Sequence, residues 1–488
     1  MNVIAESTKV KYTGIKILRT QAAISATHDA GQEFQRPGCH KNTRVAVIDR
    51  LRDWLLLKFK PEAVFLWLYG DAGAGKSSIS QTFAVRCAEE RHLLGSFFFW
   101  KDDSQRSTYS FLISTLVYQA VTAVPALKDI VNEAIERDPE IFQKHLKVQL
   151  VTLLINPIND LVDMVGFDTS VIPNLILIDG LDECSTADAQ CSILESLTDT
   201  LLLCRHRLKV LIASRPEVEI KSTFNSDPLL SCSTRLALDA SFKPNDDIRR
   251  FLVDKFETIK STHPLKAHIP STWPPREVVS VLVDRSSGQF IFALTVGKYI
   301  SERRQNPVKQ LDIIIGVRPP SSEINLPYTE LNTLYAHVLS CIHPDKMEMA
   351  LDILSFVTIV RPTLPPLAYF AKYPTPTVQF GLGPDQALCV LFSVDHADLE
   401  HYLADLSSLV KIKSEGEQRL PVVTFSHASM GDFLLDPIRS QKFYQKPQMF
   451  FAKMTKICAN YLAVTTVGPC STAPLLIPSS LTIAPHRS

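Results

Sequence analysis

The stretch Gly70-Asp71-Ala72-Gly73-Ala74-Gly75-Lys76-Ser77 decides the fold of this chain. It follows the short apolar run Val64–Tyr69 and precedes a helical pattern over 77–90. Glycines allow successive backbone N–H groups to turn inward around an anion, and the helix that follows directs the positive end of its dipole at the same anion. A strand, a glycine loop and a helix in this order predict a phosphate-binding loop.

The side chains of this loop have separate expected roles. We assign every residue from Gly70 to Ser77, together with Ser78, to nucleotide binding. Lys76 would reach the β- and γ-phosphates, and the hydroxyl group of Ser77 would ligate Mg²⁺. The predicted cofactors are therefore ATP or ADP with Mg²⁺.

A second apolar run, Leu175–Ile178, ends in an acidic residue, Asp179. A central strand of this kind can place a carboxylate beside a phosphate loop, so Asp179 is the expected acidic partner of Mg²⁺. Asp182 and Glu183 follow within one turn, where they could orient or deprotonate an attacking water. Acids after a strand also serve as ordinary helix N-cap residues, and that interpretation stays open.

Two further side chains are candidates for contact with phosphate. Arg215 follows the apolar run Leu208–Ala213, and a planar guanidinium group pairs well with phosphate oxygens, so Arg215 could sense the γ-phosphate. The alternative is a solvated arginine after a strand. His427 stands far downstream in Phe425–Leu434. From the residues alone, a single histidine near a helix start is more commonly a capping or packing residue.

The order of apolar runs and helical patterns predicts the fold class. Up to about residue 240, buried strands alternate with helices, which is typical of an α/β fold whose parallel sheet is covered on both faces. Another of these strands is expected at Ser96–Trp100. Beyond residue 240, helices are followed by a short β pair, Leu409–Ile412 with Val422–Phe425, which is compatible with a winged-helix unit.

These patterns divide the chain into six parts. They are a poorly defined lead-in (1–37), a linker helix (38–60), a nucleotide-binding domain (61–240), a small helical domain (241–318), a winged-helix-like domain (319–440) and a tail expected to be poorly ordered (441–488).

Composition limits the partners of the chain. Among its 488 residues, Lys and Arg total 51 and Asp and Glu total 51, so the formal net charge is zero. This balance argues against a protein that wraps nucleic acid or coats an anionic membrane. The sequence contains neither a secretory signal pattern nor an uninterrupted apolar run of about 18 residues. We expect a cytoplasmic protein with no membrane span and no nucleic-acid partner.

Together these residues resemble the NACHT branch of the STAND ATPases, signal-transducing switches that include the NOD-like receptors. The most similar group is the nephrocystin-type NACHT module of many fungal NOD-like receptors. The resemblance depends mainly on Asp179-Gly180-Leu181-Asp182-Glu183, and Gly38–Arg44, Phe98–Trp100 and Ala213–Pro216 support it.

This resemblance implies a nucleotide-binding domain, a small helical domain and a winged-helix domain folded over bound ADP. It also identifies His427 with a winged-helix histidine that contacts the β-phosphate of ADP. Gly288–Ile291 stands where relatives often carry a glycine–proline motif near the adenine, but the proline is absent here and we do not assign that contact. Relatives usually add an effector domain and a repeat sensor, so we expect a fragment, a truncated gene model or a switch without its own sensor.

The leading functional hypothesis is a switch of the kind found in innate immunity. ADP would hold the domains closed, and exchange for ATP, with slow regulated hydrolysis, would open them for self-association. The upstream ligand and the downstream effector are unknown. The alternatives are a non-catalytic nucleotide-binding remnant or scaffold and, less favoured, a metabolic P-loop kinase, which would require an acceptor pocket.

Overall fold

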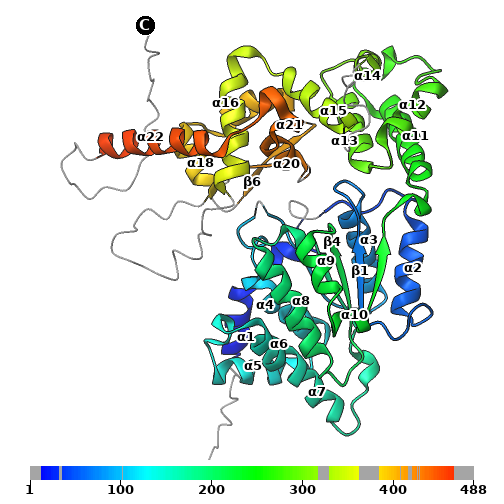
Figure 1. Ribbon diagram of the computed structural model, residues 1–488, viewed down its shortest axis with the longest axis vertical. Coiled ribbons are helices and arrows are strands. Elements are labelled where there is room, and N and C mark those ends of the chain that lie inside the picture. Colours follow the sequence, from blue (N-terminus) through cyan, green and yellow to red (C-terminus); the bar gives the residue numbers. More distant parts are fainter. Residues whose placement is uncertain are drawn as a thin grey trace, which may run out of the picture. The chain divides into compact units, whose positions relative to one another are not determined.

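The computed structural model describes residues 12–31, 36–101, 103–316, 329–361, 384–406, 408–415, 420–425, 427 and 429–465. The chain forms two compact units, Met1–Gln445 and Lys446–Ser488. The first unit contains both β-sheets of the described residues, and Figure 1 labels most of its helices together with β1, β4 and β6.

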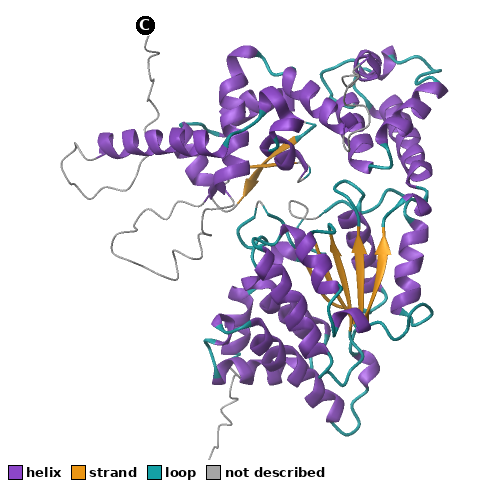
Figure 2. Ribbon diagram, viewed as in Figure 1, coloured by secondary structure: helices purple, strands orange, loops and turns teal. Residues whose placement is uncertain are grey.

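A five-stranded sheet forms the centre of the first unit, with the strand order β2-β3-β4-β1-β5. The strands are β1 (Phe65–Tyr69), β2 (Leu93–Phe98), β3 (Leu175–Asp179), β4 (Lys209–Ser214) and β5 (Ser233–Ala237). Every neighbouring pair is parallel. Helices lie on both sides of the sheet (Figure 2), because a parallel sheet buries both of its faces. The predicted α/β class is confirmed.

The two faces of the sheet bury separate hydrophobic clusters because successive strand side chains point to opposite faces. In β1, Phe65 and Trp67 belong to one cluster, and Leu66 and Leu68 belong to the other. The second cluster is completed by helices α2 (Val45–Leu55) and α3 (Lys76–Glu89).

Helix α1 and a larger group of helices cover the first face. They are α1 (Thr13–Gln21), α4 (Leu112–Ala123), α5 (Leu127–Arg137), α6 (Leu146–Leu150), α7 (Asn156–Asp163), α8 (Ala187–Leu201), α9 (Val218–Phe224) and α10 (Leu229–Cys232). Part of the lead-in therefore belongs to the core: Leu18 of α1 is fully buried, and Asn132 of α5 accepts a hydrogen bond from the backbone N–H of Ile15.

Beyond β5 the first unit is mainly helical. Its helices are α11 (Pro244–Thr262), α12 (Arg276–Ser286), α13 (Phe290–Ile300), α14 (Pro307–Gly316), α15 (Thr329–Ser340), α16 (Pro344–Ser355), α18 (Pro384–Phe392), α19 (His396–Leu403), α20 (Ser429–Leu435) and α21 (Pro437–Ser440). Strands β6 (Val410–Glu415) and β7 (Leu420–Phe425) form an antiparallel pair, which confirms the predicted β pair. The winged-helix assignment and the domain boundaries stay predictions.

The described part of the second unit contains helix α22 (Pro447–Thr465). This helix lies within the segment 441–488 that we expected to be poorly ordered, so helical order extends further than the Pro, Ser and Thr content of that segment indicated.

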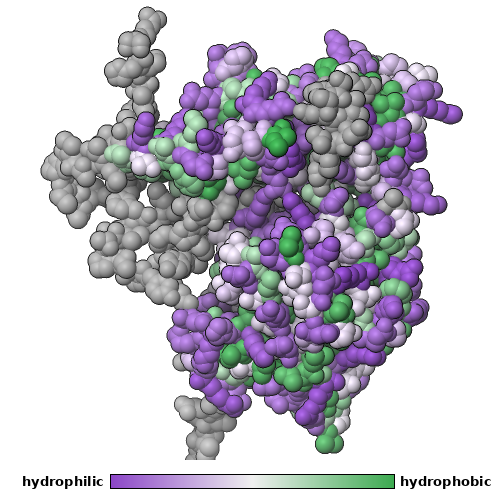
Figure 3. All heavy atoms as spheres, in the orientation of Figure 1, coloured by the Kyte–Doolittle hydropathy of each residue, from purple (hydrophilic) through white to green (hydrophobic). Residues whose placement is uncertain are grey.

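The described helices include none that is both long enough and apolar enough to cross a membrane. On the face drawn in Figure 3, hydrophilic residues predominate and hydrophobic ones are scattered. Scattered apolar side chains are normal on a protein surface and do not by themselves mark a binding site.

Candidate functional site

The register of the sheet brings the ends of three strands to one edge. Tyr69 at the end of β1 is paired with Ser214 of β4, and Asp179 at the end of β3 is paired with Ala213. The segments after β1, β3 and β4 therefore leave the sheet side by side. The edge at the carboxyl ends of parallel strands is the usual place for a ligand in such folds.

The loop between β1 and α3 depends on its glycines. Gly73 and Gly75 have φ angles of 79° and 96°, a region that favours glycine. A Cβ atom on Gly73 would also lie 2.3 Å from Cγ2 of Ile291 in α13. Nζ of Lys76 donates hydrogen bonds to the carbonyls of Gly70 (2.7 Å) and Asp71 (3.0 Å). The lysine is thus folded over its own loop, and burial lowers its pKa.

Asp179 is the most deeply buried acid of the site. Its side chain is fully buried, and among the described residues neither carboxylate oxygen has a partner at hydrogen-bonding distance. Burial raises the pKa of Asp179, although Arg36 and the hydroxyl groups of Ser77 and Ser80 oppose that increase. A buried carboxylate that makes no close hydrogen bond, with two hydroxyl groups and Arg36 acting on it, fits a position beside a cation.

A magnesium ion at this position would need more than protein ligands. The described residues contain no group of three or more His, Cys, Asp and Glu side chains that could hold a metal ion. Mg²⁺ is commonly held by one or two protein oxygens together with phosphate oxygens and water. Ser77 and Asp179 therefore suit a metal that arrives with a nucleotide.

The acids of the turn η6 (Leu181–Glu183) are each engaged by a basic residue. Asp182 accepts a hydrogen bond from the backbone N–H of Arg215 (3.0 Å), and its Oδ2 lies 3.2 Å from Nε of Arg215. Oε2 of Glu183 lies 3.5 Å from Nη2 of Arg36, and burial raises the pKa of Glu183. Asp182 is therefore paired with Arg215, and Glu183 with Arg36. A role of these two acids in activating water stays a prediction.

Arg215 also meets an acid from a distant part of the chain. Its Nη1 lies 2.8 Å from Oδ2 of Asp432 in α20, and Oδ1 of Asp432 accepts a hydrogen bond from Nζ of Lys101 (2.8 Å). Burial alone would raise the pKa of Asp432, but Lys101 and Arg215 outweigh burial and lower the pKa. Asp432 therefore joins α20 to the segments that follow β2 and β4.

His427 lies close to the same basic groups. Burial, and the positive charges of Arg215, Lys76 and Arg36, lower the pKa of His427 to about 3. Its Nδ1 accepts a hydrogen bond from the backbone N–H of Ser429 (3.1 Å). The imidazole is therefore neutral near pH 7 and carries its hydrogen on Nε2.

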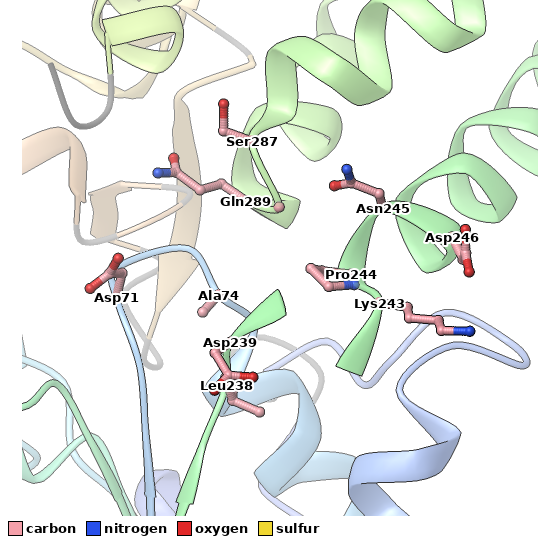
Figure 4. Close-up of a pocket in the computed structure, with 11 residues that line it drawn as sticks. Asp71, Ala74, Leu238, Asp239, Lys243, Pro244, Asn245, Asp246, Ser287 and Gln289 are labelled. Atoms are coloured by element: carbon pink, nitrogen blue, oxygen red, sulfur yellow. The ribbon is translucent and has the colours of Figure 1, made fainter. Parts of the chain in front are cut away.

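A pocket of about 570 Å³ adjoins the phosphate loop (Figure 4). Its walls come from the loop, the end of β5, the start of α11 and the turn between α12 and α13. The lining residues are Asp71, Ala74, Leu238, Asp239, Lys243, Pro244, Asn245, Asp246, Ser287, Gly288 and Gln289. Gly288 and Gln289 belong to the sequence stretch that we left unassigned.

Four basic or acidic residues of the site were not identified from the sequence: Arg36, Arg44, Lys101 and Asp432. Arg44 is buried, donates a hydrogen bond to the carbonyl of Ala74 (2.7 Å) and lies over the ring of Phe290 (4.8 Å). Arg44 stands in a stretch that supports the family resemblance, and Asp432 stands five residues after His427, so both positions had a signal in the sequence. No local pattern distinguishes Arg36 or Lys101 from a surface residue.

Residues 48–215 match a family model described as Nephrocystin 3, N-terminal. This is a NACHT-related region. It contains the loop Gly70–Ser77, Asp179, the acids of η6 and Arg215. No curated protein matches the chain. The family resemblance is thus supported over residues 48–215.

Proposed function

We propose that this chain is an ATP- and ADP-binding switch in signal transduction, with slow and regulated ATP hydrolysis. The observation that carries the proposal is the position of His427. A histidine from the far end of the first unit has its pKa lowered to about 3 partly by Lys76 of the phosphate loop and by Arg215. A residue placed in this way can report which phosphates occupy the loop.

Several features support a nucleotide as the ligand. A glycine loop before a helix can present backbone N–H groups to an anion, and Lys76 can exchange the carbonyls of Gly70 and Asp71 for phosphate oxygens. The adjoining pocket is large enough for a nucleoside. Ser77 and Asp179 would hold Mg²⁺, which neutralises charge on the phosphate oxygens when it is bound.

The same contacts support a switch more than a rapid catalyst. Asp182 and Glu183 are paired with guanidinium groups, so neither is free to act on water until those pairs rearrange. Asp432 and His427 connect the phosphate site to α20 and the segment before it. A ligand that interacts differently with these groups as ADP or ATP would bias the position of that segment.

The test begins with the nucleotide that copurifies with the full chain, released by denaturation and identified by chromatography. We expect ADP in the wild type and none in Lys76→Ala. A wild type that neither retains nor binds added ADP or ATP would overturn the proposal.

A second measurement separates a switch from a passive nucleotide holder. His427→Ala should retain less ADP and self-associate more than the wild type, as measured by light scattering. If the wild type binds nucleotide but its size is the same with ADP and ATP, and His427→Ala changes nothing, the chain is a non-catalytic nucleotide-binding protein.

A further inference from the structure

Arg36 places a guanidinium group at the acidic side of the phosphate loop. Its Nη1 donates a hydrogen bond to Oγ of Ser77 (3.2 Å), and its Nη2 lies 3.5 Å from Oε2 of Glu183. The same Nη2 donates to the backbone carbonyl of Phe99. The guanidinium is thus held by three oxygens from three different segments, one of them the hydroxyl group that we assign to Mg²⁺.

The charge of Arg36 is compensated by the acids around it. The side chain is only 17% exposed, and that of Glu183 is 12% exposed. Burial disfavours the charged form of Arg36, but Glu183 and Asp179 outweigh burial and raise its pKa. Arg36 is therefore the positive charge with the largest effect on Glu183 and Asp179, and Lys101 and Lys76 add smaller effects on Glu183 and Asp179 respectively.

Mg²⁺ makes demands that conflict with this arrangement. It requires oxygen ligands at about 2.0–2.1 Å in near-octahedral geometry. A metal ion at that distance from Oγ of Ser77 would lie a few ångströms from Nη1 of Arg36, which donates to the same oxygen. Two positive charges this close repel each other strongly at a poorly hydrated site. The guanidinium and a metal ion on this oxygen would therefore compete for the hydroxyl group of Ser77.

We propose that Arg36 is a built-in competitor of Mg²⁺, a tethered cation that occupies the acidic side of the phosphate loop until a metal-bound nucleotide displaces it. This inference rests on the proposed nucleotide-binding function. Arg36 then acts as a positioning residue: it holds Ser77 and Glu183 in place without metal, and it raises the Mg²⁺ concentration that the site needs.

The test measures binding of a fluorescent ADP analogue to the full chain, first with EDTA and then over a series of Mg²⁺ concentrations. The variants are Arg36→Gln, which removes the charge, and Arg36→Lys, which keeps a charge but lacks the planar fork. Arg137→Gln is the matched control, because Arg137 is 73% exposed and forms an ion pair with Glu133 of its own helix. Lys76→Ala reports whether binding depends on the phosphate loop.

We expect Arg36→Gln to lower the half-saturating Mg²⁺ concentration roughly tenfold, which corresponds to about 1.4 kcal/mol. Arg36→Lys should fall between Arg36→Gln and the wild type, and Arg137→Gln should match the wild type. An unchanged or higher half-saturating concentration in Arg36→Gln would overturn the inference. Weaker ADP binding by Arg36→Gln in EDTA would also overturn it, because Arg36 would then be a phosphate ligand.

If the chain does not bind nucleotide at the loop, the same experiment gives a different result. If the wild type binds no ADP under any condition, or binds it equally well in Lys76→Ala, the nucleotide site itself is wrong. If binding is sensitive to Lys76 but its Mg²⁺ dependence is the same with and without the Arg36 side chain, only the role of Arg36 is wrong.

The Arg36 variants could misfold, so a second measurement uses chains that keep Arg36. The guanidinium carbon of Arg36 lies 5.3 Å from the centre of the Trp100 ring, so displacement of Arg36 should alter Trp100 fluorescence. We expect the ADP-bound wild type to change its tryptophan emission when Mg²⁺ is added, and Trp100→Phe to lose that change. Equal responses in the two chains would contradict displacement of Arg36.

Discussion

Asp432 is paired with Arg215, with Oδ2 of the aspartate 2.8 Å from Nη1 of the arginine. Arg215 follows β4 at the edge of the sheet, whereas Asp432 lies in α20 near the other end of the first unit. The pair therefore links this edge of the sheet to α20, which begins two residues after His427. Lys101 strengthens the link through the second oxygen of Asp432.

Replacing Asp432 by Asn should loosen this link. Arg215 and Lys101 would lose their shared negative partner, so α20 would be held less firmly beside the site. Both side chains of the pair are about one quarter exposed. We expect the free energy that holds α20 beside the site to fall by about 1 kcal/mol, which corresponds to a roughly fivefold faster release of ADP. Release can be measured by displacing a fluorescent ADP analogue with excess ADP. The control is Asp345→Asn, at a side chain that is 88% exposed, and equal rates in the two variants would refute the prediction.

His427 should make the nucleotide-free chain sensitive to acid. Its pKa of about 3 in the folded state lies below its value of about 6.5 in an unfolded chain. Between these values the unfolded state binds a proton that the folded state does not, so stability falls as the pH drops below about 6.5. From pH 7 to pH 5 this amounts to at most about 2 kcal/mol.

Urea denaturation at both pH values checks this prediction. His427→Gln should lose less stability than the wild type on going from pH 7 to pH 5. The same comparison with His396→Gln, at a side chain that is 40% exposed, is the control. If the wild type and His427→Gln lose stability equally, the histidine is not held neutral by its surroundings.

Gly73 should tolerate no side chain. In Gly73→Ala the added Cβ would overlap Cγ2 of Ile291 at 2.3 Å, in addition to the strain of a φ angle of 79°. We expect ADP affinity to fall at least about tenfold, because the loop must move to relieve the overlap. Gly166→Ala is a matched control: its φ angle is 85°, but a Cβ there would meet nothing within 4 Å. Similar ADP affinities in both variants would show that the contact with Ile291 is unimportant.

Arg44 should contribute more to stability than a surface arginine of similar chemistry. Its guanidinium lies over Phe290 and donates to the carbonyl of Ala74, and lysine cannot reproduce both contacts. Arg44→Lys should destabilise the chain by about 1–2 kcal/mol in thermal or urea denaturation. Arg50 is exposed and lies over Phe59 without such a carbonyl contact, so Arg50→Lys should change stability by no more than about 0.5 kcal/mol. Equal effects would contradict this account.

Much of the fold could be predicted because buried parallel strands are short apolar runs. The predicted strands at Val64–Tyr69 and Leu175–Ile178 differ from β1 and β3 by one residue at one end. The strand expected at Ser96–Trp100 is shifted, because β2 spans Leu93–Phe98 and the apolar run continues beyond its last ladder residue. An apolar pattern reports burial, whereas a strand boundary depends on hydrogen bonds to the neighbouring strand.

The strand, glycine loop and helix around Gly70–Ser77, the strand that ends in Asp179 and the α/β class were determined by the sequence alone, because each depends on residues that are neighbours along the chain. The family resemblance implied that His427 reaches that loop, and only the tertiary structure added Arg36, Lys101 and Asp432. Arg36 is far in the sequence from the segment that carries His427 and Asp432, and packing of the first unit brings all three to one edge of the sheet. Charge compensation in a buried site depends on distances between segments, and no local pattern records those distances.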